Sequence, residues 1–270
     1  MYTLKGVVIM KKILALLLTV LFVFSLAACG AKTNDQVVVG YTIYEPMNYK
    51  DANGELVGFD TELAQKVFGN LGYKVVFQEI NWDSKYTDLD SGTIDCVWNG
   101  FTANTADDDG VQRADKVDFS YNYMENQQVV VAKAGAIKSA EDLKGKFGGA
   151  ETGSAGETYA KETFKDSTIK GFVKQTECLT EIKAGTVDFA VLDAQLAKSY
   201  CGRGDYADLA IVEGLSSDLE YYAIGFKKGS ELTAKVNEQL EKLGADGTIA
   251  SLAVKYGVEN AAIKDFSNQK

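Results

Sequence analysis

One stretch of the chain, residues 92–132, holds side chains suited to gripping a small charged molecule. In it an apolar run leads into a polar loop that contains Asn99, Gly100 and Thr102, and Arg113 follows in an otherwise acidic neighbourhood. A strand that ends in such a loop presents backbone donors and hydroxyls at its carboxyl end, where open α/β sheets bind ligands. An arginine beside that loop can hold a carboxylate with two parallel hydrogen bonds. The stretch therefore predicts a site for a small anion or an amino acid.

The composition narrows the class of protein that could carry this site. With 270 residues, 46% hydrophobic and 24% charged, the chain is long enough for two modest domains or one large domain of ordinary globular character. A net charge of −10 argues against nucleic acid as a partner. The chain contains no histidine, which excludes Ser-His-Asp and Cys-His catalysis and histidine metal sites. We expect neither a cofactor nor a bound metal.

The N-terminal segment has the pattern of a bacterial export signal. Two lysines precede an apolar run, 13–28, that is shorter than the about 20 residues of a comfortable membrane span. The run ends in Leu26-Ala-Ala-Cys29, which resembles the lipobox of bacterial lipoproteins, where the cysteine is lipidated and becomes the first residue. We therefore predict a signal peptide at 1–28, lipid (palmitate) attachment at Cys29 and a tether over 29–35. The alternative is a plain signal peptide or a membrane anchor with an incidental cysteine.

The other cysteines have simpler explanations than metal binding, since no pair has the CxxC spacing of a zinc site. Cys96 lies in an apolar run and is best explained as a core residue. Cys178 and Cys201 could form a disulfide in an exported protein or remain buried thiols, and the sequence leaves both open.

The elements that must position the polar residues alternate between strand and helix patterns. A β-α-β-α-β order implies parallel strands with helices on both faces of a sheet. Strands are expected at 36–41, 74–80, 94–98, 128–132, 146–150, 169–173, 189–192 and 221–226. Helices are expected at 61–71, 86–91, 179–184, 232–243 and 249–256, with further helix starts at Ser139 and, with the spacing of a capping box to Glu157, at Ser154.

A short internal repeat indicates two similar lobes. Leu89-Asp-Ser-Gly-Thr-Ile-Asp95 resembles Ile182-Lys-Ala-Gly-Thr-Val-Asp188, 93 positions further on. The chain can leave the first lobe along 128–132 and return along 221–226, and two strands crossing between lobes make a hinge. We expect one lobe from residues 36–129 and 224–270, and the other from residues 130–223.

Seven short motifs, in order between about Val37 and Gly257, resemble those of the extracellular solute-binding proteins of family 3, the polar amino-acid type that serves ABC importers. Each motif alone is weak, but their order behind a lipobox is specific. They are Gly54-x-x-x-Gly58-Phe-Asp60, Gly92-Thr-Ile-Asp95, Asn99-Gly-Phe-Thr102, Arg113-x-x-x-Val117-Asp-Phe-Ser120, Asp142-Leu-Lys-Gly145, Gly185-Thr-Val-Asp188 with Asp193, and Ala245-Asp-Gly-Thr248.

The resemblance implies an α/β fold of the two-lobed, periplasmic-binding-protein-like (type II) kind, with a two-strand hinge and a cleft that closes on the ligand. The resemblance implies that the protein is not an enzyme. It implies instead the binding component of an ABC importer, which captures an L-amino acid and delivers it to permease subunits that work with an ATPase. The protein would be a monomer, extracytoplasmic and held by its lipid on the outer face of the bacterial cell membrane.

The resemblance also implies ligand-binding residues in the first lobe. By position, Tyr44 matches an aromatic residue that covers the bound amino acid. Asn99, Gly100 and Thr102 match the loop that offers backbone and hydroxyl groups. Arg113 matches the arginine that holds the α-carboxylate.

In the second lobe, Ser154 and Ala155 match a loop that gives that carboxylate another donor, and Asp193 matches the acid that holds the α-ammonium. The chemistry agrees, because a zwitterion needs a guanidinium at one end and a carboxylate at the other, both paired when buried. A helix N-terminus near Ser154 also favours an anion.

Several of these residues have a structural explanation as well. Arg113 could pair with nearby aspartates, Asp193 could cap the helix that follows it, and Tyr44 could be a packing aromatic. Structural turn and cap roles are expected for Asp60, Asp95 and Asp188, and core or cleft-wall roles for Trp82 and Trp98.

The segment before Arg113 departs from the family pattern. The family usually runs Thr-x-x-Arg, whereas residues 104–112 form an apparent insertion here, so Arg113 is matched by its distance to Phe119-Ser120. We interpret Asp107 to Asp109 as a solvated loop, since a calcium loop needs more ordered spacing. Ala155 replaces a second small hydroxyl, so contact there would come from the backbone.

The sequence is compatible with two other functions, an enzyme and a ligand sensor. A secreted enzyme of the same fold, such as a dehydratase, would need a general acid or base in the cleft, where Glu45 is the only obvious spare carboxylate. A ligand sensor would signal through a separate partner, because this chain has no fused signalling domain. The sequence does not choose the amino acid, although Glu45, Tyr41 and Trp82 are candidates to shape the pocket.

Overall fold

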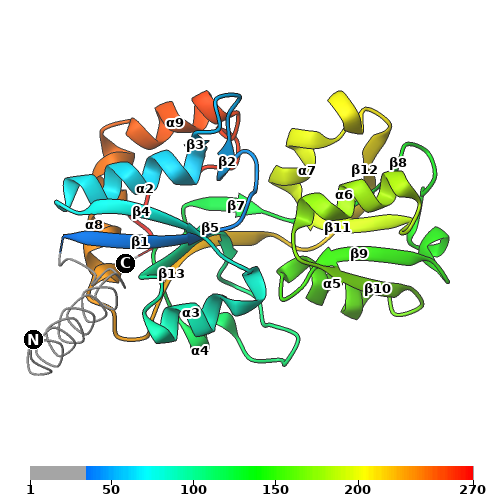
Figure 1. The fold of residues 1–270 in the computed structure, drawn as a ribbon, viewed down its shortest axis with the longest axis horizontal. Coiled ribbons are helices and arrows are strands. Elements are labelled where there is room, and N and C mark those ends of the chain that lie inside the picture. Colours follow the sequence, from blue (N-terminus) through cyan, green and yellow to red (C-terminus); the bar gives the residue numbers. More distant parts are fainter. Residues whose placement is uncertain (1–34, 270) are drawn as a thin grey trace, which may run out of the picture. The chain divides into compact units, whose positions relative to one another are not determined.

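Within the described residues, two large β-sheets, each covered by helices on both faces, form the framework of the fold (Figure 1). The computed structural model describes residues 35–269, of which those from Val37 onward form one compact unit. The predicted signal peptide, the lipid attachment at Cys29 and most of the tether lie outside the described residues. None of the helices within 35–269 combines the length and the hydrophobicity that crossing a membrane requires.

The first sheet has the strand order β4-β1-β5-β13-β6, with β7 paired to β13. β1 and β5 are parallel, and β13 is antiparallel to β5. All seven residues of β5 are buried, because Trp98 packs into the core on one face and Val97 and Phe101 pack on the other. The strands are β1 (Gln36–Tyr41), β4 (Lys74–Glu79), β5 (Cys96–Thr102), β6 (Asp118–Phe119), β7 (Met124–Asn126) and β13 (Glu220–Phe226), beside a hairpin of β2 (Tyr49–Lys50) and β3 (Leu56–Val57). The helices are α2 (Phe59–Asn70), α3 (Lys85–Ser91), α4 (Arg113–Lys116), α8 (Leu232–Ala245) and α9 (Thr248–Tyr256), with a 3-10 turn at Trp82–Ser84.

The second sheet has the order β10-β9-β11-β8-β12. β10, β9 and β11 are parallel, as the βα alternation predicts, whereas β8 is antiparallel to both of its neighbours. The strands are β8 (Gln128–Lys133), β9 (Phe147–Glu151), β10 (Thr168–Phe172), β11 (Phe189–Asp193) and β12 (Leu209–Ser216). The helices are α5 (Ala155–Thr163), α6 (Gln175–Ala184) and α7 (Ala194–Tyr200), with 3-10 turns at Ala140–Leu143 and Gly204–Tyr206.

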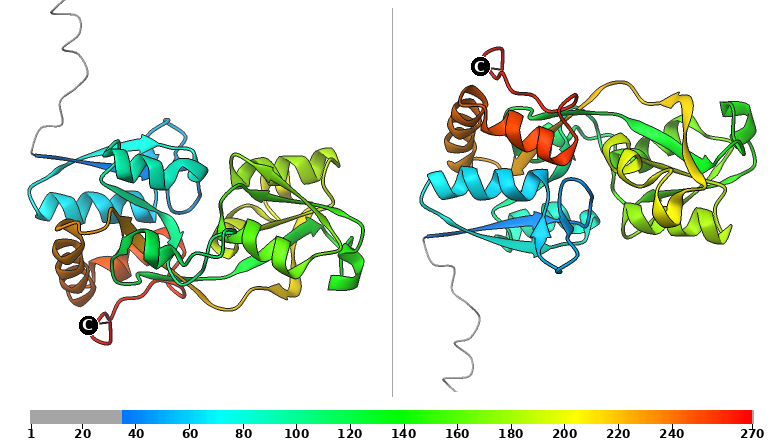
Figure 2. Two further views of the ribbon diagram at one scale, coloured as in Figure 1. Left: turned by 90° about the horizontal axis from the view of Figure 1, so that it is seen from below. Right: turned by 90° about the horizontal axis from the view of Figure 1, so that it is seen from above.

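The chain passes between the two sheets twice, through the β7–β8 and β12–β13 connections (Figures 1 and 2). The two connections touch, because Gln127 Nε2 donates to the Ser217 carbonyl at 2.8 Å and the Gln128 N–H donates to Ser217 Oγ at 2.9 Å. Two sheets joined by two adjacent strand connections form the two-lobed fold with a two-strand hinge, and the predicted fold class is confirmed.

The repeat in the sequence is a repeat in the structure. Gly92 and Gly185 each end a helix in the left-handed conformation, at φ 73° and 76°. Asp95 then accepts a hydrogen bond from the backbone of β1 at 2.7 Å, and Asp188 accepts one from the backbone of β9 at 2.9 Å. Both aspartates therefore fasten a strand start in their own lobe, and their interpretation as structural residues is confirmed.

The cysteines in the described part of the chain are all free thiols. Cys96 and Cys178 are fully buried and Cys201 is half-buried, so the structure has no Cys178–Cys201 disulfide. Burial raises the pKa of the Cys178 thiol, with Glu151 as the next contribution, and burial raises that of Cys201 to about 11. Both thiols are therefore protonated at neutral pH, which makes them unreactive packing residues.

Candidate functional site

The last residues of β5 present the predicted polar loop, and a buried aspartate of α2 fixes its backbone. Asp60 Oδ2 accepts hydrogen bonds from the Gly100 N–H at 3.0 Å and from the Tyr123 hydroxyl at 2.8 Å. Gly100 has φ 61°, and a Cβ there would lie 2.7 Å from the Tyr44 ring, so only glycine fits. The Asn99 side chain is held by Thr42 and Asn48.

Tyr44 is buried where the two lobes meet, with Asp193 and the Leu196 backbone near its hydroxyl, and it does not line the small cavity between them. It is 2% exposed, and its hydroxyl shares a hydrogen bond of 2.7 Å with the Tyr222 hydroxyl. Its ring packs edge-on against the ring of Tyr222 and approaches Gly100. In this structure Tyr44 supports the loop from behind.

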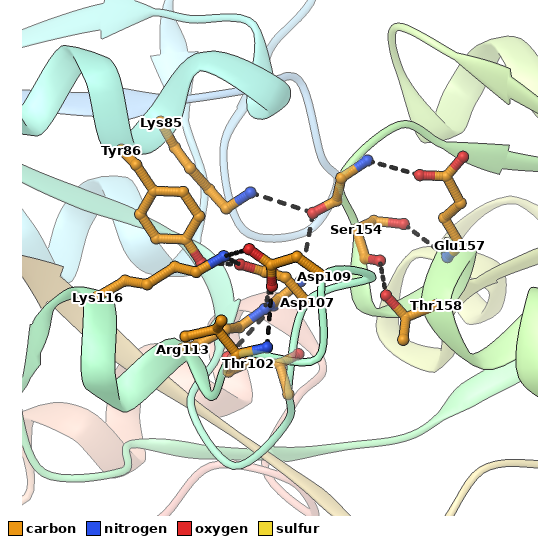
Figure 3. Close-up of polar contacts among 12 residues, drawn as sticks. Lys85, Tyr86, Thr102, Asp107, Asp109, Arg113, Lys116, Ser154, Glu157 and Thr158 are labelled. Carbon is orange, nitrogen blue, oxygen red and sulfur yellow. Dashed lines mark hydrogen bonds and ion pairs between the residues drawn. The ribbon is translucent and has the colours of Figure 1, made fainter.

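Arg113 begins α4 and is 1% exposed (Figure 3). Its Nε donates to Asp107 Oδ1 at 2.8 Å. Its Nη1 donates to the Thr102 carbonyl and its Nη2 to the Gly153 carbonyl in the second lobe, each at 3.3 Å. The Nε edge of the guanidinium is thus anchored by a carboxylate, and the two Nη atoms donate hydrogen bonds to main-chain carbonyls.

The anchor Asp107 belongs to the inserted segment, and its interpretation as solvated is wrong. Asp107 is 7% exposed, and its Oδ2 accepts from Lys116 Nζ at 2.8 Å and from the Tyr86 hydroxyl at 2.6 Å (Figure 3). Burial opposes ionisation of Asp107, but the charge of Arg113 and the bond from Lys116 prevail and lower the pKa to about 2. Only Asp108 and Asp109 are exposed as predicted. The insertion folds back and orients the arginine.

The second lobe presents the start of α5, nine residues long, to the same place. Ser154 is its N-cap, and Ser154 Oγ accepts from the Glu157 N–H at 3.0 Å. The returning bond of the predicted capping box is displaced by one residue, because Glu157 Oε2 accepts from the Gly153 N–H at 2.8 Å (Figure 3). Ser154 and Ala155 therefore lie at a helix N-terminus, where backbone N–H groups favour an anion.

Asp193 ends β11 and is 7% exposed. It occupies the N-cap position of α7, but its carboxylate makes no capping bond, so the explanation as a helix cap is wrong. Oδ1 accepts instead from Asn126 and Gln128 of the hinge strands, both at 2.7 Å, and Oδ2 accepts from Gln175 at 2.5 Å. Burial raises the pKa of Asp193, while these hydrogen bonds oppose the shift.

A small polar cavity between the lobes collects seven of the eight predicted site residues, all except Tyr44. Its volume is about 10 Å³, which is room for about one water molecule. Trp82, one of the candidates to shape the pocket, lines it, whereas Tyr41 and Glu45 do not. The complete lining is Trp82, Asn99, Gly100, Thr102, Arg113, Glu151, Ser154, Ala155, Gln175 and Asp193.

Glu151 and Gln175 were not predicted as site residues. Glu151 terminates β9 as Asp193 terminates the neighbouring β11, so a carboxylate at the end of an apolar strand was an available signal. Burial raises the pKa of Glu151 to about 8, with the charge of Asp193 as the next cause. Gln175 follows a polar turn and begins α6, where nothing in the sequence marks it.

Two further buried charges lie behind the cavity wall. Glu220 of β13 accepts from Gln128 at 2.9 Å, and burial followed by the charge of Asp193 raises its pKa to about 7. Lys85 of α3 is 2% exposed and donates to the Gly153 carbonyl at 3.1 Å across the lobes. Burial and then the charge of Arg113 lower the pKa of Lys85 to about 7.

The fold and the polar cavity between two hinged lobes define a solute-binding protein. The chain belongs to the bacterial extracellular solute-binding proteins, family 3, whose family model matches residues 37–259. It is similar to the arginine-binding extracellular protein ArtP of Bacillus subtilis, with 31% identity over 92% of this chain and 98% of that protein.

Solved structures agree with this placement. An ancestral arginine-binding protein bound to arginine superposes with a TM-score of 0.74 at 36% identity, covering 83% of this chain and 99% of that one. An ancestral amino acid-binding protein, described as a precursor of cyclohexadienyl dehydratase, reaches a TM-score of 0.72 at 31% identity, covering 82% and 95%.

Proposed function

We propose that this protein is the extracytoplasmic substrate-binding component of an ABC importer, and that it captures an L-amino acid between its lobes. The observation that carries the proposal is the pairing of opposite charges across one cavity, Arg113 from the first lobe and Asp193 from the second. A free amino acid has the complementary charges, a carboxylate and an ammonium. The related arginine-binding proteins support the same class of ligand.

The contacts of Arg113 suggest how the ligand carboxylate is held. Asp107 keeps Nε, whereas Nη1 and Nη2 donate only to carbonyls at 3.3 Å, which a charged carboxylate would replace with stronger bonds. The Ala155 N–H and the Ser154 hydroxyl at the start of α5 are the further donors from the second lobe, since the Ser154 N–H already donates to the Glu151 carbonyl at 3.1 Å. The arginine is thereby oriented before the ligand arrives.

Asp193 receives the α-ammonium in this proposal. Its three amide donors come from Asn126, Gln128 and Gln175, so the carboxylate is already turned toward the hinge strands and the cavity. A buried carboxylate is tolerated only when it is paired, and an ammonium completes the pairing. Because Asn126 and Gln128 belong to the two sides of the hinge, the ammonium site is tied to closure.

Ligand entry requires the lobes to separate, since a cavity of about 10 Å³ cannot admit an amino acid. A ligand that bridges Arg113 and Asp193 then stabilises the closed form, which a membrane permease and its ATPase would recognise. We take residues 36–129 with 224–270 as one lobe and 130–223 as the other, and expect the protein to act as a monomer.

Membrane attachment is the remaining part of the proposal. The export pattern of residues 1–28 and the lipobox ending in Cys29 support a lipoprotein held by palmitate on the outer face of the bacterial membrane. The tether at 29–35 would keep the lobes near the permease.

An enzyme on this fold is favoured by one observation. Glu151 is a buried carboxyl in the cavity whose pKa of about 8 keeps it protonated at neutral pH, as a general acid requires. Glu45 is therefore not the only candidate acid. Incubation with prephenate tests this function: release of phenylpyruvate would support it, and no turnover beyond the Glu151→Gln variant would exclude it.

A thermal-shift screen tests capture directly. Residues 30–270, which contain the whole compact unit, are freed of bound ligand and screened against the twenty amino acids and cystine. A ligand at 100 times its Kd should stabilise the protein by about 2.7 kcal/mol and raise its Tm. Arg113→Ala or Asp193→Ala should abolish the rise. No rise with any amino acid would contradict the proposed function.

A further inference from the structure

Glu151 is the one carboxylate on the cavity wall whose hydrogen bonding is incomplete within residues 35–269. It is 3% exposed, and its Oε1 has no hydrogen-bond partner there. Nor does any ion pair in the described part of the chain include it. An unsatisfied buried carboxyl oxygen is costly, so its persistence in a binding cavity calls for a partner that arrives with the ligand.

The charges on the cavity wall do not balance for a plain zwitterion. The charged side chains that line the cavity are Arg113, Asp193 and Glu151. In the proposed function the α-carboxylate matches Arg113 and the α-ammonium matches Asp193, so neither of these two ligand groups pairs with Glu151.

Lys85 is the nearest alternative counterion, but it is already engaged. Its Nζ donates to the carbonyls of Trp82 and Gly153, at 3.3 Å and 3.1 Å. It also lies over the rings of Tyr86 and Phe101, at 4.6 Å and 5.9 Å from their centroids. No hydrogen bond or ion pair within residues 35–269 joins Lys85 to Glu151, so Glu151 Oε1 remains open to a group of the ligand.

We propose that Glu151 determines specificity by receiving the cationic side chain of the ligand, so that the substrate class is the basic L-amino acids. The proposal rests on the proposed function. The placement agrees with it, because Glu151 and Asp193 end adjacent parallel strands and face the same cavity as Arg113. A guanidinium or ammonium group extending from a ligand held by Arg113 and Asp193 meets Glu151 as the remaining anion of the wall.

A proton is released when such a ligand binds. The pKa of Glu151 near 8 makes the free carboxyl largely neutral at pH 7, and an adjacent cation favours its ionised form. The groups that face Glu151 are Asp193 from β11, Glu177 and Cys178 from α6, Lys85 from α3 and, across the cavity, Arg113 from α4. Binding of a basic amino acid therefore strengthens as the pH rises from 6 to 8, whereas binding of a neutral analogue lacks this contribution.

The experiment compares L-arginine with L-citrulline, a neutral analogue of nearly the same shape, by isothermal titration calorimetry. Residues 30–270 are used, as wild type and as Glu151→Gln, with the Tm of both checked for folding. Wild type should prefer arginine by about 10- to 100-fold, the value of a hydrogen bond to a charged group. Glu151→Gln should abolish the preference by weakening arginine binding more than citrulline binding.

Repeating the wild-type titrations in two buffers of different ionisation enthalpy measures the proton release without any variant. Arginine should release a proton at pH 7 and citrulline should release none. Equal losses for both ligands in Glu151→Gln, or an intact preference for arginine, would overturn the proposal. Tighter binding of a neutral or acidic amino acid by wild type would also overturn this proposal. That result would leave the proposed function, capture of an amino acid, intact. The absence of binding for every amino acid would instead refute the proposed function.

Discussion

At the scale of single residues, the proposed ligand-binding arginine, Arg113, is oriented by a carboxylate that belongs to an insertion. Asp107 reaches Arg113 and Lys116 with separate oxygens, at 2.8 Å each, and so sets the direction of the guanidinium before a ligand is present. Preorganisation of this kind contributes to affinity because the side chain loses less freedom on binding. The insertion is therefore part of the site, although none of its residues lines the cavity.

Asp107→Asn should weaken amino-acid binding by about tenfold, because a neutral amide holds Arg113 less firmly. The same change should lower the free energy of unfolding by about 1–3 kcal/mol, since two cations lose a buried partner. Titration calorimetry and urea unfolding measure the two effects. Asp115→Asn is the matched control, because Asp115 is an exposed aspartate on the same short helix as Arg113. Equal behaviour of the two variants would contradict this role of Asp107.

The low pKa of Asp107 predicts how stability depends on pH. Its folded-state pKa of about 2 lies below the ordinary value of 3.8, so its contribution is complete above pH 4 and is lost as the pH falls toward 2. The difference in unfolding free energy between wild type and Asp107→Asn should therefore shrink between pH 4 and pH 2. Urea titrations at fixed pH values measure it, and a constant difference would show that Asp107 is not paired in solution.

Gly100 is the second residue on which the site depends. Gly100→Ala adds a Cβ at 2.7 Å from the Tyr44 ring, so it should cost about 1–3 kcal/mol of stability from overpacking in addition to the strain of φ 61°. Gly54→Ala is the control, because Gly54 has φ 82° but open space around its Cβ position. The difference between their urea midpoints isolates the clash. Equal midpoints would mean that the loop gives way freely.

At the scale of elements, the site is made where strands end. β5 of the first sheet and β9 and β11 of the second each finish in a polar or acidic residue that lines the cavity. The carboxyl ends of the parallel neighbours β9 and β11 lie at one edge of their sheet, where open α/β sheets bind ligands. Helix starts complete it, with Arg113 opening α4 and Ser154 capping α5. The apolar runs before these residues set the strands, so the positions of the strand-end residues follow from local patterns.

Residues at the ends of strands could be predicted from the sequence, whereas residues buried by tertiary contacts could not. The strand and helix periods locate most elements to within a few residues, and Asn99, Thr102 and Asp193 follow from their places after apolar runs. Glu151 has the same signature as Asp193, and it was missed because no motif pointed to it. The burial of Asp107 could not be predicted, because three consecutive aspartates are usually solvated and only the folded insertion brings cations to one of them.

Lys85 is a further residue that no local pattern predicts, since a lysine on a short helix is ordinarily exposed. It becomes buried because Trp82, Tyr86 and Phe101 surround it and the second lobe offers it the Gly153 carbonyl. Its burial depends on the approach of the two lobes, so its titration reports on their closure.

Lys85→Met should remove a pH dependence of stability. The folded pKa of about 7 lies below the ordinary 10.5, so the unfolded chain binds more protons and wild type gains stability as the pH rises from 7 toward 10. Lys85→Met lacks the titrating group and should not show this gain in stability. The control Lys50→Met, which changes an exposed lysine, should keep the gain seen in wild type. Tm measured across this range for all three proteins tests it. Parallel curves would mean that Lys85 is solvated and the lobes stand apart in solution.

At the scale of the whole molecule, closure is a balance between the ligand and direct contacts of the lobes. Within residues 35–269, two ion pairs join the lobes in addition to the Lys85–Gly153 hydrogen bond: Lys174–Glu79 at 2.5 Å and Lys161–Asp108 at 3.5 Å. Partly exposed pairs of this kind contribute about 0–1 kcal/mol each and weaken with salt. Contacts this weak favour the closed form only slightly, so under the proposed function the ligand decides the equilibrium between open and closed forms.

Lys174→Gln should therefore raise the Kd of the amino acid identified by the thermal-shift screen by about two- to fivefold at low salt. Affinity changes because the closed, ligand-holding form loses a contact that the open form never makes. Lys144→Gln is the matched control, since Lys144 pairs with Glu141 at 2.7 Å inside one lobe. The Kd of wild type and of both variants is measured by calorimetry at low ionic strength and at 1 M salt. Screening at 1 M salt should erase the effect of Lys174→Gln. An equal change in both variants, or an effect that survives high salt, would mean that the pair does not act through closure.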